Sequence, residues 1–265
     1  MDLGISGRCV FFTGGSKGMG RVAAKMLARE GCDVAIVART KADVDAVVGE
    51  ITAEGGKAIG VAADVTVQEE VRRAVAEVSD VFGPPLIVVG QTKFIVPGDF
   101  ADIKNSEYYV DSFRTYTMSQ LYLLQEVLPA MQRAGWGRYV HIGSATAKEP
   151  VGAIHHSIAN ATRPSTIGLL KTVADEYAKF GITVNTVAPG WILTENTEEY
   201  TAKYLGLTTN EDRDRWATEH VHVPAGRMGR PAEIASLIVY LCSDLAGYIT
   251  GNWIEVDGGL HRSAF

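Results

Sequence analysis

Residues 9–31 read CVFFTGGSKGMGRVAAKMLAREG, in which a short apolar run leads into a glycine-rich segment and then into a helix-forming segment. Gly14, Gly18 and Gly20 fall in the turn between the expected strand and the expected helix. Glycine lets backbone amides approach a pyrophosphate closely, while the helix N-terminus supplies unpaired N–H groups and a partial positive charge. Because the turn follows a strand and opens a helix, we interpret it as the phosphate-binding loop of a dinucleotide-binding protein rather than as a plain structural turn.

The rest of the chain repeats this alternation of strand and helix. Short β-branched or apolar runs predict strands at 8–13, 34–38, 57–62, 86–90, 138–143, 182–187 and 252–256. The segments between them favour helices, and strands joined by helices of this length form right-handed parallel crossovers with helices on both faces of the sheet. The sequence therefore predicts an α/β fold with a doubly wound, seven-stranded parallel sheet.

The chain is expected to form one dinucleotide-binding domain over residues 1–265. No repeat, low-complexity tract or Pro/Gly/Ser-rich linker marks a boundary. One segment differs from the rest, because between 194 and 230 the strand pattern is lost and aromatic and aliphatic residues alternate with polar ones at roughly helical spacing. We predict that 194–230 forms a lid over the substrate, and its aromatic residues suggest a small, partly apolar substrate.

Composition and charge exclude several classes of function. The formal charge of −6 is spread along the chain, and no Lys/Arg-rich run is present that would follow a nucleic acid or an anionic membrane. No uninterrupted run of about 18 apolar residues occurs, and the N-terminus enters a strand at once, which leaves no room for a signal segment. The cysteines Cys9, Cys32 and Cys242 are odd in number and far apart, as in a reducing compartment. We expect a cytoplasmic protein with a small-molecule substrate and without nucleic-acid or membrane partners.

The end of the second expected strand indicates which dinucleotide is bound. In NAD-selective sites an acidic residue lies there, about 20 residues after the loop, and binds the ribose 2′-hydroxyl. Here Ala38 takes that position, Arg39 follows it, and Lys17 lies inside the loop. Two cations without an acidic residue suit a 2′-phosphate, although both could also be solvated surface charges. The sequence therefore predicts NADP(H) as the cofactor.

Further motifs occur along nearly the whole chain. They are TGGSKGMG at 13–20, Asp64 after the third strand, IGS at 142–144, GITVNTVAPG at 181–190 with Thr194 beyond it, GRMGRPAEI at 226–234 and ITGNWIEVDGG at 249–259. Together they resemble the short-chain dehydrogenase/reductase family.

The resemblance implies a Rossmann-type sheet with strand order 3-2-1-4-5-6-7 and a homotetramer or homodimer. No metal site is expected. With the loop analysis, the resemblance assigns the cofactor contacts. The residues are Gly14, Ser16, Lys17, Gly18, Met19, Gly20 and Arg39 at the phosphates, Asp64 near the adenine, Arg163 at the ribose, and Pro189, Gly190, Ile192 and Thr194 near the nicotinamide, with Val65 and Gly90 as further contacts.

The chain departs from the family pattern where the catalytic residues are expected. Aligning from Lys171, the positions of the family's Tyr-x-x-x-Lys motif fall on Ala159 and Arg163, and a shifted register that offers His156 and Asn160 instead needs a three-residue insertion in the following helix. The helix position that usually holds a catalytic Asn falls on or next to Tyr116. The family's Asn-Asn-Ala-Gly is replaced by residues 89–92, Val-Gly-Gln-Thr, so other groups are expected to support the central sheet.

Carbonyl reduction builds negative charge on oxygen, so a proton donor and hydrogen-bond donors must lie about 3 Å from that atom. Ser144, at the end of the fifth strand, is expected to hydrogen-bond a substrate oxygen. Arg163 can supply positive charge and bind the ribose, but it does not give up its proton and cannot act as an acid. The family's proton donor is therefore missing from position 159.

Three residues could replace that donor. His155 lies four residues before Ala159 on one helical stripe, and His156 lies three residues before it. Histidine titrates near neutral pH, whereas the third candidate, Tyr116, would donate from its phenol. Each also has a structural interpretation, as a surface or capping histidine or a packed tyrosine. Pro164 predicts that the helix is kinked or starts afresh nearby, which would leave both histidines in a loop.

The leading hypothesis is an NADP(H)-dependent oxidoreductase that interconverts a carbonyl and a hydroxyl, with an atypical active site. A second hypothesis keeps the fold but assigns a dehydratase, isomerase or cyclase, with His155, His156 or Tyr116 as acid and base. A third is a catalytically silent NADP(H)-binding protein.

Overall fold

The computed structural model describes residues 1–92, 98–150 and 156–263. In this part of the chain, seven strands form one parallel sheet in the order β3-β2-β1-β4-β5-β6-β7. The strands are β1 (Cys9–Thr13), β2 (Asp33–Ala38), β3 (Lys57–Ala62), β4 (Ile87–Gly90), β5 (Gly137–Ile142), β6 (Ile182–Pro189) and β7 (Trp253–Val256). The predicted fold class and strand order are confirmed, and every strand begins and ends within two residues of its expected bounds.

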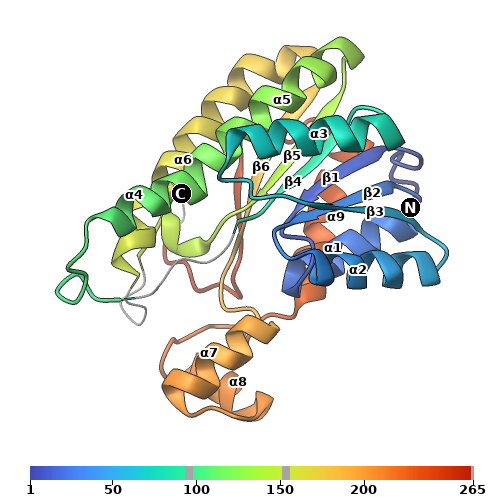
Figure 1. Cartoon of the computed structure of the whole chain (residues 1–265). Coiled ribbons are helices and arrows are strands. Elements are labelled where there is room, and N and C mark those ends of the chain that lie inside the picture. The colour runs from blue at the N-terminus through green and yellow to red at the C-terminus, as the bar shows by residue number, and fades with distance from the viewer. Residues whose placement is uncertain (93–97, 151–155, 264–265) are drawn as a thin grey trace.

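Helices cover both faces of the sheet (Figure 1). One face carries α3 (Gln68–Phe82), α5 (Ser119–Ala134) and α6 (Ser157–Tyr177), and the other carries α1 (Gly18–Arg29), α2 (Lys41–Ala53) and α9 (Pro231–Leu241). Side chains alternate along β1, so Val10 and Phe12 enter the core beneath α1 and α9, while Phe11 packs beneath α3 and α5. Both faces are therefore buried, which explains why the strands read as continuous apolar runs.

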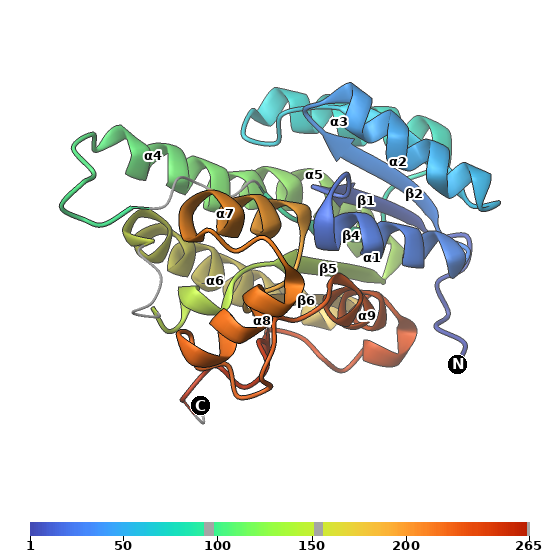
Figure 2. The same cartoon turned by 90° about the horizontal axis from the view of Figure 1, so that it is seen from below.

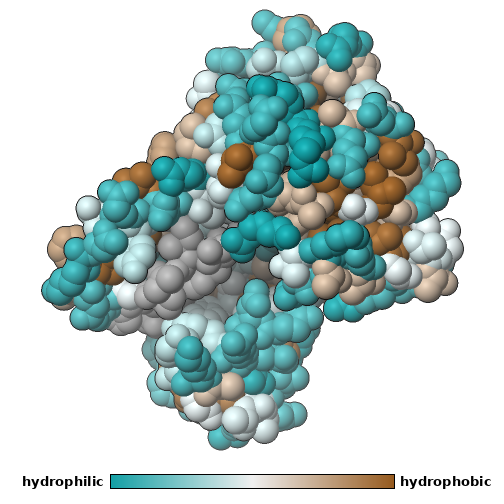
Figure 3. Space-filling view, viewed as in Figure 1, coloured by the Kyte–Doolittle hydropathy of each residue, from teal (hydrophilic) through white to brown (hydrophobic). Residues whose placement is uncertain are grey.

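The lid predicted at 194–230 contains α7 (Glu195–Leu205) and α8 (Asn210–Glu219), which project from the body as a separate lobe (Figures 1 and 2). Buried Arg213 of α8 joins the two helices, because its Nε donates to the Thr201 hydroxyl at 2.8 Å and its terminal nitrogens reach the Glu198 and Thr208 carbonyls. The lobe is largely hydrophilic outside, with a hollow between it and the body (Figure 3).

The helix that follows β5 corrects one prediction. The expectation that α6 starts afresh near Pro164 is wrong, because the helix begins at Ser157 and continues through the proline to Tyr177. His156 lies before the helix, as expected, and a kink at Pro164 stays a prediction. Hydroxyl contacts from the preceding helices hold this segment, since Ser112 meets Thr162 at 2.7 Å and Thr117 meets Ser165 at 2.6 Å. These tertiary bonds offset the main-chain bond that proline removes.

The described helices include none long and apolar enough to cross a bilayer. All three cysteines are buried and free, as expected for thiols that pack as small apolar groups. Burial is also the main reason that the pKa values of Cys9 and Cys32 are raised to about 12, with the nearby Asp33 charge second.

Candidate cofactor and catalytic site

A cavity of about 1020 Å³ runs along the carboxyl ends of the strands. Its described walls combine the loop after β1, the ends of β2, β3 and β5, the segment after β6, and α7. Of the predicted site residues it is lined by Gly14, Ser16, Lys17, Met19, Arg39, Asp64, Val65, Tyr116, Ser144, His156, Arg163, Pro189, Gly190 and Ile192. The sheet therefore brings the expected cofactor and catalytic residues to one site, as parallel α/β folds do at this edge.

The glycine-rich loop has a backbone geometry that only glycine accommodates well. Gly14 and Gly18 have positive φ, at +68° and +53°, which other residues rarely adopt. A Cβ on Gly20 would overlap the Gly14 carbonyl oxygen, so α1 approaches the loop more closely than a side chain allows. Gly18 and Gly20 are not among the cavity-lining residues, and their part is to fix this backbone.

The expected 2′-phosphate end of the cavity contains a residue that the sequence did not suggest. Lys17 and Arg39 both line it, but so does Asp43 from the first turn of α2, whose Oδ2 lies 2.8 Å from Lys17 Nζ. The expectation of two cations without an anion is therefore incomplete. The sequence signal for Asp43 was its position four residues after Arg39.

Four of the cavity-lining side chains form a continuous chain of contacts. Arg163 Nη2 donates to the Tyr116 hydroxyl at 3.3 Å, and Arg163 Nη1 donates to Thr146 Oγ1 at 3.0 Å. Thr146 Oγ1 in turn lies 3.1 Å from Ser144 Oγ. The Arg163 guanidinium also stands over the Tyr116 ring, 4.9 Å from its centroid. Thr146 was missed by the sequence analysis because nothing marks one threonine in the segment after β5.

The direction of these hydrogen bonds follows from arginine, which can only donate. Thr146 and Tyr116 must both accept from Arg163, so each hydroxyl keeps its own proton for another partner. The Thr146 proton is available to Ser144, which leaves the Ser144 proton for a group in the cavity. Arg163 therefore orients two hydroxyl donors, Tyr116 and Ser144.

Tyr116 occupies the place next to Ala159 rather than a distant surface. It lies in the short π-helix Arg114–Met118, between α4 (Glu107–Phe113) and α5, and its ring packs in a small cluster with Ala159 and Ile158. Ala159 is only 3% exposed and is not among the cavity-lining residues, whereas Arg163, one turn further along α6, is one of them. The small side chain at 159 leaves room for the phenol of Tyr116.

The histidine candidates differ in what the structure says of them. His156 precedes α6 and lines the cavity, whereas His155 lies outside the described residues. A histidine that the sequence analysis did not select, His141 on β5, also lines the cavity. Burial, and then the nearby Arg163 charge, lower the pKa of His141 to about 3, so its ring is neutral. The available signal was a histidine within an apolar strand, three residues before Ser144.

Besides Gly18 and Gly20, two further predicted cofactor residues are not among the described cavity-lining residues. Thr194 caps α7, accepting from the Thr197 N–H at 3.3 Å. Gly90 lies on β4 against Gln120, which accepts from the Tyr139 hydroxyl at 2.8 Å. At the end of β4, the Thr13 hydroxyl donates to the Gln91 carbonyl at 2.8 Å. These contacts support the central strands where the family's usual residues are absent.

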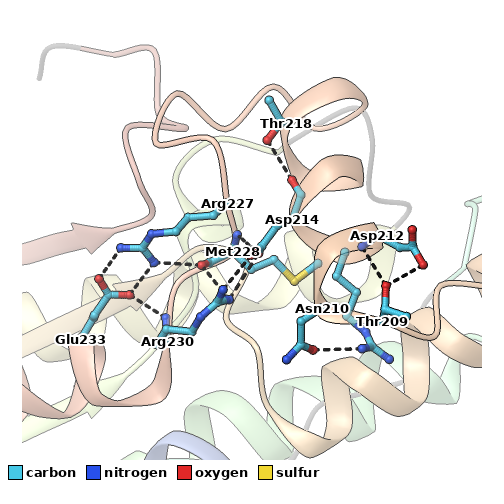
Figure 4. Close-up of polar contacts among 10 residues, drawn as sticks. Thr209, Asn210, Asp212, Asp214, Thr218, Arg227, Met228, Arg230 and Glu233 are labelled. Atoms are coloured by element: carbon cyan, nitrogen blue, oxygen red, sulfur yellow. Dashed lines mark hydrogen bonds and ion pairs between the residues drawn. The ribbon is translucent and has the colours of Figure 1, made fainter.

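Charged groups join the lobe of α7 and α8 to the start of α9 (Figure 4). Asp214 of α8 accepts from Arg230 Nη2 at 2.7 Å and from the Met228 N–H at 2.9 Å. Burial alone would raise the pKa of Asp214, but these hydrogen bonds lower it overall. Arg227 pairs with Glu233 in the first turn of α9 and lowers the pKa of Glu233 to about 2, with the Arg230 N–H contributing next. These contacts tie α8 to the segment that leads into α9.

This arrangement defines a dinucleotide-binding α/β protein, and comparisons with known proteins agree. A family model described as enoyl-(acyl carrier protein) reductase matches residues 14–261. The 3-oxoacyl-[acyl-carrier-protein] reductase FabG of Haemophilus influenzae is 31% identical over 260 residues, which cover 98% of this chain and 100% of that protein. The chain belongs to the short-chain dehydrogenase/reductase family, and these matches support an oxidoreductase.

Solved structures are similar over nearly the whole chain. L-sorbose reductase from Gluconobacter frateurii, in complex with NADPH and L-sorbose, has a TM-score of 0.91 at 30% identity and covers 99% of this chain and 100% of its own. An NADPH-bound short-chain oxidoreductase from Pseudomonas aeruginosa, described as containing an atypical catalytic center, has a TM-score of 0.90 at 25% identity and covers 98% of this chain and 99% of its own.

Proposed function

We propose that this chain is an NADP(H)-dependent oxidoreductase that interconverts a carbonyl and a hydroxyl on a small, partly apolar substrate, with Tyr116 as the proton donor. The main support is the Arg163 guanidinium, which donates to the Tyr116 hydroxyl at 3.3 Å and to the Thr146 hydroxyl at 3.0 Å. All three residues line the cavity that the phosphate-binding loop also lines. The phenol thus comes from the π-helix rather than from position 159 of α6.

The cofactor is NADP(H), as in the NADPH complexes of L-sorbose reductase and the Pseudomonas aeruginosa oxidoreductase. The residues fit NADP(H), because Gly20 lets α1 lie closer to the loop than a side chain would allow. The cavity also extends from Lys17 and Arg39 to Ser144. The loop amides and the N-terminus of α1 would hold the pyrophosphate, and Lys17 and Arg39 the 2′-phosphate. When bound, the nicotinamide supplies the hydride for the substrate carbonyl carbon.

The chain's own residues serve the substrate oxygen. Ser144 donates a hydrogen bond to the carbonyl and orients it, while Tyr116 transfers its proton to the same oxygen as the hydride reaches the carbon. The positive charge of Arg163 stabilises the phenolate that remains on Tyr116. Ketone, hydride and proton together give the alcohol, and the reverse sequence oxidises it. Neutral His141 adds no positive charge next to Arg163.

Two measurements test the function. NADPH absorbance at 340 nm is followed with a panel of ketones, aldehydes and polyhydroxy ketones, and the active substrate is repeated with NADPH deuterated at the transferred position. We expect loss of absorbance and deuterium at the carbinol carbon. Turnover without either change would support a dehydratase, isomerase or cyclase, and binding of NADPH without turnover of any substrate would support the silent protein.

A swap of residues tests the position of the phenol. Tyr116→Asn should abolish reduction, and adding Ala159→Tyr should restore part of it, because the two side chains share one cluster. Ala159→Tyr alone should be disruptive, since Tyr116 fills the adjacent space. Full activity in Tyr116→Asn alone would refute the assignment.

A further inference from the structure

One carboxylate of the lid reaches the phosphate-binding loop. Glu195, the first residue of α7, accepts a hydrogen bond from the Gly18 N–H, with 3.1 Å between Oε2 and N. Gly18 is the first residue of α1, so this N–H is one of the donors that a helix leaves without an intrahelical partner. Such donors, at the positive end of the helix dipole, are what a pyrophosphate uses. A carboxylate oxygen satisfies the same donor.

A second carboxylate holds the loop's cation. Asp43 Oδ2 lies 2.8 Å from Lys17 Nζ, and both residues line the cavity together with Arg39. The side chain of Asp43 is 32% exposed and that of Lys17 is 57% exposed, so the pair is accessible to an incoming anion. The two contacts lie on adjacent residues, 17 and 18, but their carboxylates come from different elements, α2 and α7.

We propose that Glu195 and Asp43 compete with the two phosphate groups of the cofactor, Glu195 with the pyrophosphate and Asp43 with the 2′-phosphate. This inference rests on the proposed NADP(H) site. Binding the cofactor exchanges each internal carboxylate for a phosphate, and it releases the start of the lid from the loop because Glu195 belongs to α7. The two carboxylates therefore lower cofactor affinity, and Asp43 also narrows the preference for NADPH over NADH.

The two carboxylates differ in which nucleotide they oppose. Both NADPH and NADH carry the pyrophosphate, whereas only NADPH carries the 2′-phosphate. Glu195→Gln should therefore tighten both nucleotides by a similar factor, while Asp43→Asn should tighten NADPH and leave NADH unchanged. For partly exposed charges we expect a factor of about 3 to 5 in Kd in each case.

The test is a fluorescence or calorimetric titration of NADPH and NADH against the full-length wild type and each variant, without substrate. The matched controls are Asp45→Asn, on the same helix as Asp43 but paired with Lys41, and Glu199→Gln, on the same helix as Glu195. Neither control residue lines the large cavity. Thermal unfolding of every variant checks that the fold is retained.

The outcomes separate the inference from the function on which it rests. An unchanged ratio of NADPH to NADH affinity in Asp43→Asn, or unchanged affinities in Glu195→Gln, overturns the corresponding half of the inference. Weaker NADH binding in Asp43→Asn also overturns it, because the carboxylate would then be a ligand of the ribose. Failure of wild-type protein to bind either nucleotide would instead remove the proposed cofactor site itself.

Discussion

Substitution of Gly20 by alanine tests how closely α1 approaches the phosphate-binding loop. The added Cβ would overlap the Gly14 carbonyl oxygen and lie 2.9 Å from Gln91 Oε1. The Gly14 oxygen is a main-chain atom that cannot rotate away, and ordinary contacts between carbon and oxygen are about 3.3 to 3.6 Å. The loop backbone must therefore shift, and overpacking of this kind costs about 1 to 3 kcal/mol.

Gly49→Ala is the matched control, since Gly49 is helical and a Cβ there meets no atom within 4 Å. That change should stabilise the protein by about 0.5 to 1 kcal/mol. Urea unfolding should thus show opposite signs for the two variants, and NADPH titration should show weaker binding only for Gly20→Ala. Equal stability and equal NADPH affinity of the two variants would refute the close approach inferred at Gly20.

Three further predictions concern charge and the thiols. Arg39→Asp should shift cofactor preference from NADPH toward NADH, whereas Lys41→Asp, which changes a residue outside the cavity, should not. Equilibrium titrations give the ratio of the two Kd values, and an unchanged ratio for Arg39→Asp would contradict the assignment of Arg39 to the 2′-phosphate. Because the pKa of Glu233 is lowered from 4.5 to about 2, its pairing with Arg227 stabilises the fold fully above pH 4.5 and is lost as pH falls toward 2. The difference in urea midpoint between wild type and Glu233→Gln should shrink over that range, and a constant difference speaks against the pairing. The three buried thiols should react with a disulfide reagent at pH 8 only after unfolding, and rapid reaction of the native protein would contradict their burial.

The sheet and the order of its strands could be predicted because each layer of the fold produces a recognisable pattern in neighbouring residues of the sequence. Parallel strands buried on both faces must be apolar throughout, as Val10 to Phe12 are, and the turn after β1 must carry glycines where α1 meets the loop. The cofactor-binding side of the site follows from these patterns, since the carboxyl ends of parallel strands lie at one edge of the sheet.

The catalytic side of the site depends on packing between segments that are distant in the sequence, and such packing produces no pattern in neighbouring residues. Arg163 meets Tyr116 across 47 residues of chain, and only the approach of α6 to the π-helix brings them together. The hydrogen bond between the Ser112 and Thr162 hydroxyls likewise stabilises α6 next to Pro164, although proline tends to break a helix. Asp43 could not be placed from the sequence, because it lies in the first turn of α2 and only the fold brings it to Lys17.

Measurement of the hydride-transfer step in Tyr116→Phe most directly tests whether Tyr116 is the proton donor. Single-turnover absorbance at 340 nm compares wild type, Tyr116→Phe and the control Tyr109→Phe, which alters a tyrosine of the same cluster that does not line the cavity. Loss of a general acid costs about 10²- to 10⁴-fold. We predict a loss of that size for Tyr116→Phe, with unchanged NADPH affinity and a nearly unchanged rate for Tyr109→Phe. Equal hydride-transfer rates in wild type and Tyr116→Phe would show that Tyr116 is not the proton donor.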